Sequence, residues 1–476
     1  MRRSGLHLRR LFLLAVAPLP LLAAIAPGLF LDPLLSVRAA TALTGDTEAA
    51  FAATRETGHW ISWAWSKQSG QLSLETLIGL FYVGWGLYCA SLAQAVFRED
   101  AKITRAMVLA AALMLAPPAA DLAFALPDAI PTVWLIAVHA LLVLVLPVMI
   151  ASALLPFAVA LMMMTDASLA PLPLATHVLG LTGPRFGHDD GILLRSLGLF
   201  LIGGTLGAVC VFALNDWQHG VFGMTSPIAV PLAEDEERLS MIGTWLSTML
   251  RDVPVPLVVA ALGGAVAAFI TLFLINSREG DRLLGALVIA LLVLFGQALL
   301  SGEAPPSRGL LVPWVLLLGA LATAARAAGK GALGSVFILL VLAALAAGGS
   351  QWHAIHAPLE PLRASTRALA TEIQAQITSA AATNDASEPR LLAIGGSPSQ
   401  IDGGEGLREY GQLALRLRQL TGIAAVQCPG ADPVCNQHQI QLATMPKRPD
   451  PGWVATAPDG VILIRLPDGI FAPVRP

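Results

Sequence analysis

A chemically equipped segment lies between the first two long apolar stretches of the chain, in LTGDTEAAFAATRETGHWISWAWSKQSGQ, residues 43–71. Carboxylates can take a proton from a hydroxyl, and indole rings combine an apolar face with one N–H donor. The segment carries three carboxylates, one histidine and three tryptophans: Asp46, Glu48, Glu56, His59, Trp60, Trp63 and Trp65. This set of groups is typical of a site where a carboxylate acts as a general base or a metal ligand and the tryptophans form a platform for a sugar ring or a lipid.

The segment also has a structural interpretation, and the sequence leaves both open. TGDTEAAFAATRETG predicts a helix that begins after Asp46 and ends at Gly58. Asp46 or Glu48 is the candidate base, and Asp46 is the better one, because N-terminal backbone N–H groups keep a carboxylate at the helix start ionised. In the alternative, the helix lies at the membrane surface and the tryptophans form an interfacial belt.

The elements that position this segment are mostly apolar. The chain has 476 residues, of which 55% are hydrophobic and 13% charged, against about 25% charged in a soluble domain. A net charge of −3 gives no indication of nucleic-acid binding. Apolar runs predict nine spans: 11–31, 73–96, 106–126, 131–153, 194–214, 255–275, 283–300, 309–327 and 332–349. The fold class predicted is an all-α polytopic membrane protein of about 9–11 transmembrane helices with a small C-terminal α/β domain.

The first apolar run follows four arginines and is long enough to span a bilayer. This favours a signal anchor, although cleavage near residues 23–26 stays open. The stretch 131–164 has no charge and is interrupted by Pro147 and Pro156, so it reads as one helix or two. If this stretch crosses the membrane once, thirteen lysines and arginines lie on the cytoplasmic side and six on the outer side, leaving aside the C-terminal domain. If it crosses twice, the numbers are ten and nine. The positive-inside rule therefore favours one crossing.

This topology predicts a multi-pass protein of the bacterial inner membrane with a cytoplasmic N-terminus. Residues 1–350 form the membrane domain, and its large outer loops are 32–72 and 215–254. A helix and linker (351–388) lead to a small periplasmic domain (389–476). In that domain RLLAIGG, IAAVQC, HQIQLATM and GWVATAPDGVILIRL predict strands, and GLREYGQLALRLRQLTG predicts an amphipathic helix.

Cys428 and Cys435 bracket a tight Pro/Gly loop in this domain. In an oxidising compartment they are expected to form a disulfide with Cα atoms within about 7 Å. Free thiols, or a metal site that uses the nearby His438, are the alternatives. Arg308, at the mouth of a late span, is an outer cation that either anchors the span at the head groups or holds a phosphate.

The layout resembles the integral-membrane GT-C glycosyltransferases, especially the bacterial multi-span glucosyltransferases that modify surface polysaccharides. The resemblance rests on GDTEAAFAATRETGHW just after the first span and PPSRGLLVPWVLLLGAL late in the chain. The adjacent acids that are usual in that family are here separated by Thr47. The resemblance implies a polyprenyl-phosphate sugar as donor and Asp46 or Glu48 as base. A divalent cation, Mg²⁺ or Mn²⁺, is a candidate cofactor.

The resemblance therefore implies sugar transfer from a polyprenyl-phosphate donor to an envelope glycan or lipid on the outer membrane face. The side chains expected to bind substrate are Glu56, His59, Trp60, Trp63 and Arg308. A non-enzymatic assembly subunit that binds an envelope protein through the C-terminal domain is the first alternative. A transporter ranks third, because intramembrane charges are few and no inverted repeat is visible. The sequence shows no P-loop motif, so ATP-driven transport has no support from it.

Overall fold

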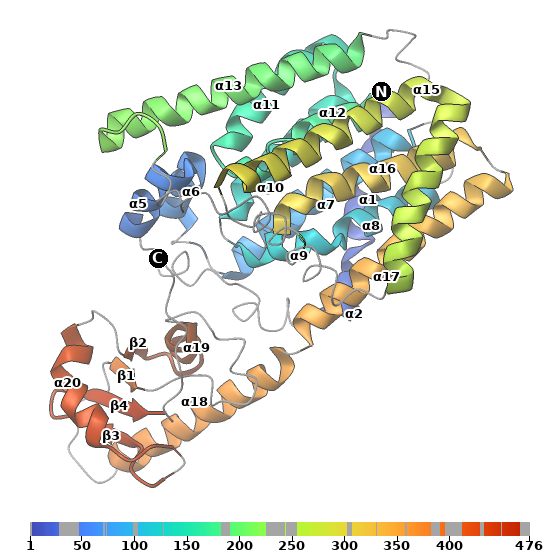
Figure 1. Cartoon of the computed structure of the whole chain (residues 1–476). Helices are drawn as coiled ribbons and strands as arrows, with labels where there is room; N and C mark the ends of the chain where they lie inside the picture. The colour runs from blue at the N-terminus through green and yellow to red at the C-terminus, as the bar shows by residue number, and fades with distance from the viewer. Residues whose placement is uncertain are drawn as a thin grey trace. The chain divides into compact units, whose positions relative to one another are not determined.

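The computed structural model describes residues 2–27, 47–69, 72, 74–98, 103–126, 128–181, 191–224, 243, 255–301, 307–329, 331–357, 359–381, 391–395, 412–428, 433–448 and 450–466. These residues form two compact units, one through Ala354 and one from Ile355 onward. The first unit is entirely helical in its described part, and the second contains a small sheet (Figure 1).

The helices of the first unit form a bundle. Their bounds are α1 Arg2–Val16, α2 Leu19–Ile25, α5 Thr47–Thr57, α6 Trp60–Ser69, α7 Leu74–Val96, α8 Thr104–Met114, α9 Pro117–Phe124, α10 Ala129–Val145, α11 Val148–Met163, η2 Ala167–Leu169, α12 Leu172–Gly180, α13 Ile192–His219, α15 Val255–Ser301, η4 Ser307–Leu310, α16 Leu311–Ala327 and α17 Ala332–His356. A kink at Asn276, which has non-helical backbone angles, divides α15 into two arms.

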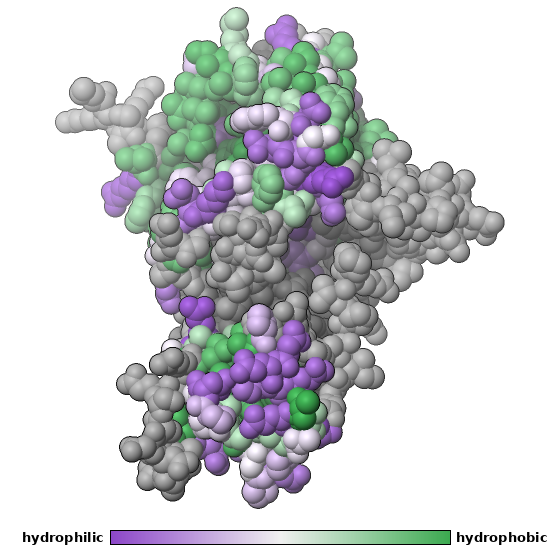
Figure 2. All heavy atoms as spheres, turned by 90° about the vertical axis from the view of Figure 1, so that its left-hand side faces the viewer, coloured by the Kyte–Doolittle hydropathy of each residue, from purple (hydrophilic) through white to green (hydrophobic). Residues whose placement is uncertain are grey.

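Length and apolar composition make several of these helices able to cross a membrane. Among the described residues five qualify, or six if α8 and α9, which meet at an angle of 56°, form one broken span. Large apolar side chains such as Met149, Leu194 and Leu274 are exposed on the bundle, and apolar residues (green) gather in the upper part of the face that Figure 2 shows. Exposed apolar surface of this extent is what lipid contact requires. The expectation of a multi-pass membrane protein therefore agrees with the helices.

Small residues let two long helices approach closely. A Cβ added at Gly203 of α13 would lie 2.6 Å from the carbonyl oxygen of Pro156 on α11. One added at Gly207 would lie 2.8 Å from the Cβ of Met163. Because such contacts are too short for any side chain, glycine at these positions sets the spacing between α11 and α13.

The stretch 131–164 differs from its predicted single crossing. It forms two helices, α10 and α11, which break at Leu146 and Pro147. Ser62 on α6 donates hydrogen bonds to the carbonyl oxygens of both Asp128 and Thr165, so the start of α10 and the end of α11 lie together. The two helices are therefore a hairpin. A prolyl residue cannot donate a backbone hydrogen bond, and Pro147 begins α11 after a sharp change of direction.

The second unit contains α18 (Leu359–Ala381), α19 (Gln412–Thr421), α20 (Pro433–Thr444) and a four-stranded sheet of order β2-β1-β4-β3. The strands are β1 Leu391–Gly395, β2 Ala424–Cys428, β3 Val454–Thr456 and β4 Val461–Arg465. β1 is parallel to β2 and β4, while β3 is antiparallel to β4. Alternation along β1 sends Leu392 and Ile394 to the core with α18 and α19, and Ala393 to the core with α20.

One element of this unit was predicted wrongly. HQIQLATM lies in helix α20 rather than in a strand. Pro433 is the first residue of that helix, a position where its fixed φ is favourable. Helical spacing puts Cys435, His438 and Leu442 on the buried face and leaves Ile440 82% exposed. The alternating pattern of the sequence concealed this period because glutamines separate the apolar residues.

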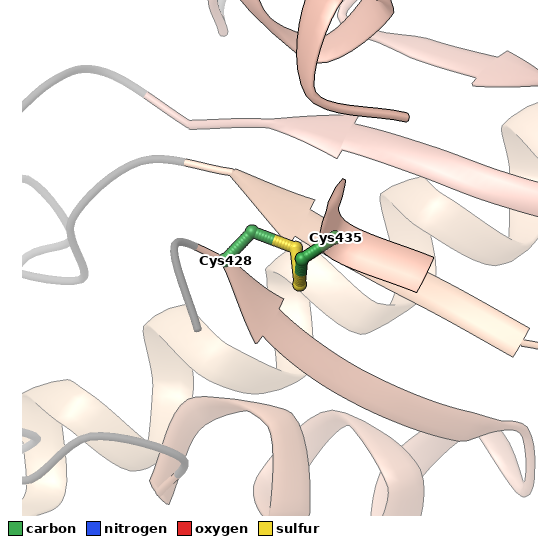
Figure 3. Close-up of a disulfide and its surroundings, with 2 residues drawn as sticks. All are labelled: Cys428 and Cys435. Atoms are coloured by element: carbon green, nitrogen blue, oxygen red, sulfur yellow. A yellow bond between two sulfur atoms is a disulfide. The ribbon is translucent and has the colours of Figure 1, made fainter. Parts of the chain in front are cut away.

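Cys428 and Cys435 are joined by a disulfide (Figure 3). Their Cα atoms are 5.5 Å apart, within the limit set from the sequence. The bond links the end of β2 to the first turn of α20, and both residues are buried. His438, the candidate ligand of the metal alternative, instead lies 2.9 Å from a carboxylate oxygen of Asp459.

Candidate functional site

A cavity of about 270 Å³ opens at one end of the bundle. Its wall combines charged groups, hydroxyls, an indole and small apolar residues: Ala53, Thr54, Thr57, His59, Ser62, Trp63, Leu122, Ala125, Asp128, Ala129, Thr132, Thr165, Asp166 and Arg308. Ligand pockets usually measure about 300–1,000 Å³. The volume lies just below this range, so the cavity suits a small polar head group such as a sugar phosphate.

The helices α5 and α6 form one wall and are fastened to the end of α13. Asn215, which is fully buried, accepts a 2.9 Å hydrogen bond from the indole of Trp60 and donates to the backbone of Arg55 and Gly223. His219 adds a 2.9 Å contact with the hydroxyl of Thr54. These bonds hold the α5–α6 hairpin in place against the bundle.

The turn between α5 and α6 depends on Gly58. Its φ of +71° suits glycine, and an added Cβ would lie 2.7 Å from Val211. The turn places His59 in the cavity wall at the start of α6. Burial lowers the pKa of the His59 imidazole, Asp166 opposes this effect, and the positive charge of Arg308 reinforces it. Because burial dominates, His59 is neutral at neutral pH.

Arg308 comes from η4, immediately before α16, and its Nε pairs with the Asp166 carboxylate. Asp166 precedes η2 and also accepts hydrogen bonds from the backbone N–H and the hydroxyl of Ser168, at 3.1 and 2.6 Å. These bonds orient the carboxylate, which in turn holds one edge of the guanidinium. The terminal nitrogens of Arg308 have no partner among the described residues, and its side chain is 31% exposed. Two N–H-bearing nitrogens are thus left for a ligand.

Asp128 lies just before α10 and supplies a second carboxylate to the cavity. Its side chain is accessible, yet protein surrounds it on most sides, and this desolvation raises the pKa of its carboxyl to about 6. The positive charge of Arg308 acts in the opposite direction. Asp128 is therefore mostly ionised at neutral pH but more basic than a solvated aspartate, which is the property a general base needs.

Trp63 contributes an unsatisfied donor to the same wall. Its indole Nε1 is buried and has no hydrogen-bond partner among the described residues. The ammonium of Lys67 lies 3.6 Å from the ring centroid, so a cation covers one face of the indole. The indole therefore carries a donor that the described residues leave unsatisfied, while the nitrogen itself is buried.

Some of the site residues predicted from the sequence line the cavity, and others do not. His59, Trp63 and Arg308 meet in the cavity, as their assignment to one site requires. Trp60 does not line it, and its indole N–H is bonded to Asn215. Glu56 is exposed on α5 and also lies outside the lining. Asp46 is outside the described residues, and for Glu48 only the backbone, in the first turn of α5, is described.

Asp128 and Asp166 were missed. Both flank the charge-free stretch 131–164, which is the signal that could have identified them. The predicted single crossing placed residue 166 on the cytoplasmic side and Arg308 on the outer side. The ion pair between Asp166 and Arg308 shows that this assignment is wrong, because the α10–α11 hairpin returns the chain to the end where it started.

No group of three His, Cys, Asp or Glu side chains that could hold a metal occurs in the part of the chain that the structure describes. No family model, curated protein or solved structure matches the chain.

Proposed function

We propose that the protein is a multi-pass membrane transferase that moves a sugar from a polyprenyl-phosphate donor to an envelope glycan or lipid acceptor, with the cavity as its active site. The observation that carries this proposal is that one cavity holds an accessible carboxylate of raised pKa and an arginine with free terminal nitrogens. Sugar transfer needs these two functions, a base for the acceptor hydroxyl and a cation for the departing phosphate.

In this mechanism Asp128 takes the proton from the acceptor hydroxyl while that oxygen attacks the anomeric carbon of the donor. The bond between that carbon and the phosphate oxygen breaks, and the negative charge that develops on the phosphate is stabilised by the terminal nitrogens of Arg308. Trp63 lines the cavity and offers the sugar ring an aromatic wall. Asp166 and Ser168 hold the guanidinium in position and so act through Arg308.

The bundle also supports an orientation. At the other end of α7 and α16, Arg105 bonds the backbone of Gly329, and Arg326 bonds the backbone of Val96 and the carboxylate of Glu279. Arg98, Arg278 and Arg282 lie within three residues of these contacts in the sequence, and we name this the arginine end. Arginine in short loops marks the cytoplasmic side, so the cavity faces outward from a bacterial inner membrane. The hairpin changes the predicted path of residues 129–181. It does not change the membrane side predicted for the residues after 190, because α12 leaves the cavity end and α13 returns to it. The last bundle helix, α17, also runs toward the cavity end, since Gly348 packs on Leu115 near α9. This supports an outer position for the C-terminal domain.

The experiment measures sugar transfer in proteoliposomes from a panel of polyprenyl-phosphate hexoses. The readout is the amount of polyprenyl phosphate released. Asp128→Asn keeps the shape of the side chain and removes the base, so release is expected to fall at least 100-fold. Asp216→Asn, an exposed acid on α13 outside the cavity, is the matched control and should match the wild type. Asp46→Asn measured in parallel ranks the base predicted from the sequence against Asp128.

The second candidate function is a non-enzymatic assembly subunit, favoured by the separate folded unit that follows the bundle with a core of its own. The two functions differ in a complementation test. If no donor of the panel is turned over, and Asp128→Asn and Arg308→Ala restore a deletion strain fully, the transferase proposal is wrong and the assembly function stands.

A further inference from the structure

Two histidines meet inside the bundle, away from the cavity. His139 lies on α10 and His177 on α12, with exposed fractions of 3% and 0%. Their ring centroids are 6.4 Å apart and the ring planes are inclined by 32°. Ionisable side chains in the interior of a membrane bundle are costly and usually serve a function.

Each ring has one nitrogen held by protein and one nitrogen free. His139 hydrogen-bonds to the backbone of Pro173, which has only a carbonyl to offer, while its Nε2 has no partner among the described residues. The Nε2 of His177 lies 3.2 Å from the hydroxyl of Ser152, while its Nδ1 has no described partner. Buried nitrogens without partners are rare because their desolvation is not compensated. A histidine that ligates a metal has this same division, one nitrogen bonded to an outer partner and the other to the metal.

We propose that His139 and His177 bind one monovalent copper ion, Cu(I), between the Nε2 of the first and the Nδ1 of the second. A metal about 2 Å from each of two facing ring nitrogens separates the ring centroids by about 6 Å, and the observed separation is 6.4 Å. Imidazole is a suitable ligand for copper, and Cu(I) accepts two ligands in a nearly linear arrangement.

The charge of the surroundings favours a monovalent ion. The described contacts of the two rings include no carboxylate. Two neutral imidazoles do not compensate the charge of a divalent ion, and an uncompensated double charge in an apolar interior is strongly unfavourable. A single charge costs much less, so the pair selects Cu(I) over Zn²⁺.

The site is connected to the cavity through one face of α10. Thr132 lines the cavity, and His139 lies seven residues, or two helical turns, further along the same face. On the other side Thr176, next to His177, is 3.3 Å from the hydroxyl of Tyr88. The copper site uses none of the residues assigned to sugar transfer and does not depend on that proposal.

The test measures Cu(I) binding by the purified full-length protein in detergent, with ascorbate as reductant and a chromophoric Cu(I) chelator as competitor. Cys89 and Cys210 are free thiols and would compete, so both are replaced by alanine, whereas the disulfide is kept intact. The purification tag contains no histidine or cysteine. This parent protein should bind one Cu(I) per chain, and X-ray absorption should show two nitrogen neighbours.

His139→Gln and His177→Gln in this parent should each weaken Cu(I) binding by at least 100-fold. His353→Gln, an exposed position on α17, is the matched control and should bind like the parent. Ser152→Ala removes the outer partner of His177 and should weaken binding about 10-fold.

Three results overturn the proposal: no Cu(I) bound by the parent, full binding by both glutamine variants, or one Zn²⁺ bound per chain without Cu(I). If the glutamine variants do not fold, the parent and Ser152→Ala decide the matter. A rise in the melting temperature of the parent on Cu(I) addition, reduced in Ser152→Ala, supports the site, and equal or absent rises contradict it.

Discussion

The bundle has an arginine–carboxylate pair at each end, and the two pairs differ in what they leave unused. At the arginine end, Arg326 donates one terminal nitrogen to the carbonyl oxygen of Val96 and the other to both carboxylate oxygens of Glu279, at 2.9–3.0 Å. At the cavity end, Arg308 meets Asp166 through Nε and keeps its terminal nitrogens free of described partners. A guanidinium whose terminal nitrogens all bond to protein groups has a structural role. A guanidinium held through Nε alone still has two terminal nitrogens that can bind a ligand.

The largest expected effect comes from replacing each arginine by lysine. Arg308→Lys keeps the charge but loses the forked donors, so sugar transfer should fall about 10²–10³-fold while the protein remains folded. Arg326→Lys should leave transfer per folded molecule within about threefold but lower the melting temperature by a few degrees, because it breaks a largely buried pair. Proteoliposome transfer assays and thermal melting of the same preparations check both. Equal loss of transfer in the two variants would remove the distinction between the two ends.

The pH dependence of transfer sharpens the role of the cavity. Asp128 acts as a base only when ionised, and its pKa is raised to about 6. Below that pH the rate should fall about tenfold per unit, and it should rise through pH 6 to a plateau near neutral pH. The pKa of His59 is lowered, mainly by burial, so His59→Asn should keep the inflection near pH 6. An inflection that disappears in His59→Asn would assign the base to His59 instead.

Removal of the disulfide in the second unit should affect that unit alone and leave both ends of the bundle unchanged. Replacing Cys428 and Cys435 by alanine removes the constraint on a short loop of the unfolded chain, which is worth about 2 kcal/mol. Unfolding of the C-terminal domain should become easier by that amount. Transfer by the cavity and melting of the bundle should not change. Limited proteolysis of the two units, followed by mass spectrometry, separates these effects.

The smallest expected effect tests the wall that α5 and α6 form. Gly58→Ala forces a Cβ onto a residue with positive φ and against Val211, which should cost about 1–2 kcal/mol. If α5 and α6 only lie on the bundle, the variant should lose stability alone. If they position His59 and Trp63, the Michaelis constant for the donor should also rise several-fold. Gly220→Ala, at another positive φ but with open space around it, is the control for backbone strain.

Parts of the site were visible from the sequence because they are local. The helix that ends at Gly58 is encoded by consecutive residues, and α5 covers the predicted stretch. His59 and Trp63 were identified because acids, a histidine and three tryptophans gather in one short segment, and Arg308 because it is a cation at the mouth of a predicted span. Asp128 and Asp166 escaped because each reads as the ordinary polar end of a span, and only their shared cavity gives them a role.

The sequence by itself determined the apolar helices, the hairpin of β3 and β4, and the separation of a polar C-terminal unit, because hydropathy and turn residues act over short distances along the chain. Only the tertiary structure decided how α10 and α11 turn back and that HQIQLATM is helical. It also decided that the indole N–H of Trp60 bonds to Asn215 while that of Trp63 has no described partner. These outcomes depend on contacts between residues far apart in the sequence, such as Ser62 with Thr165 and Asp166 with Arg308. No local pattern encodes the free energy of those contacts.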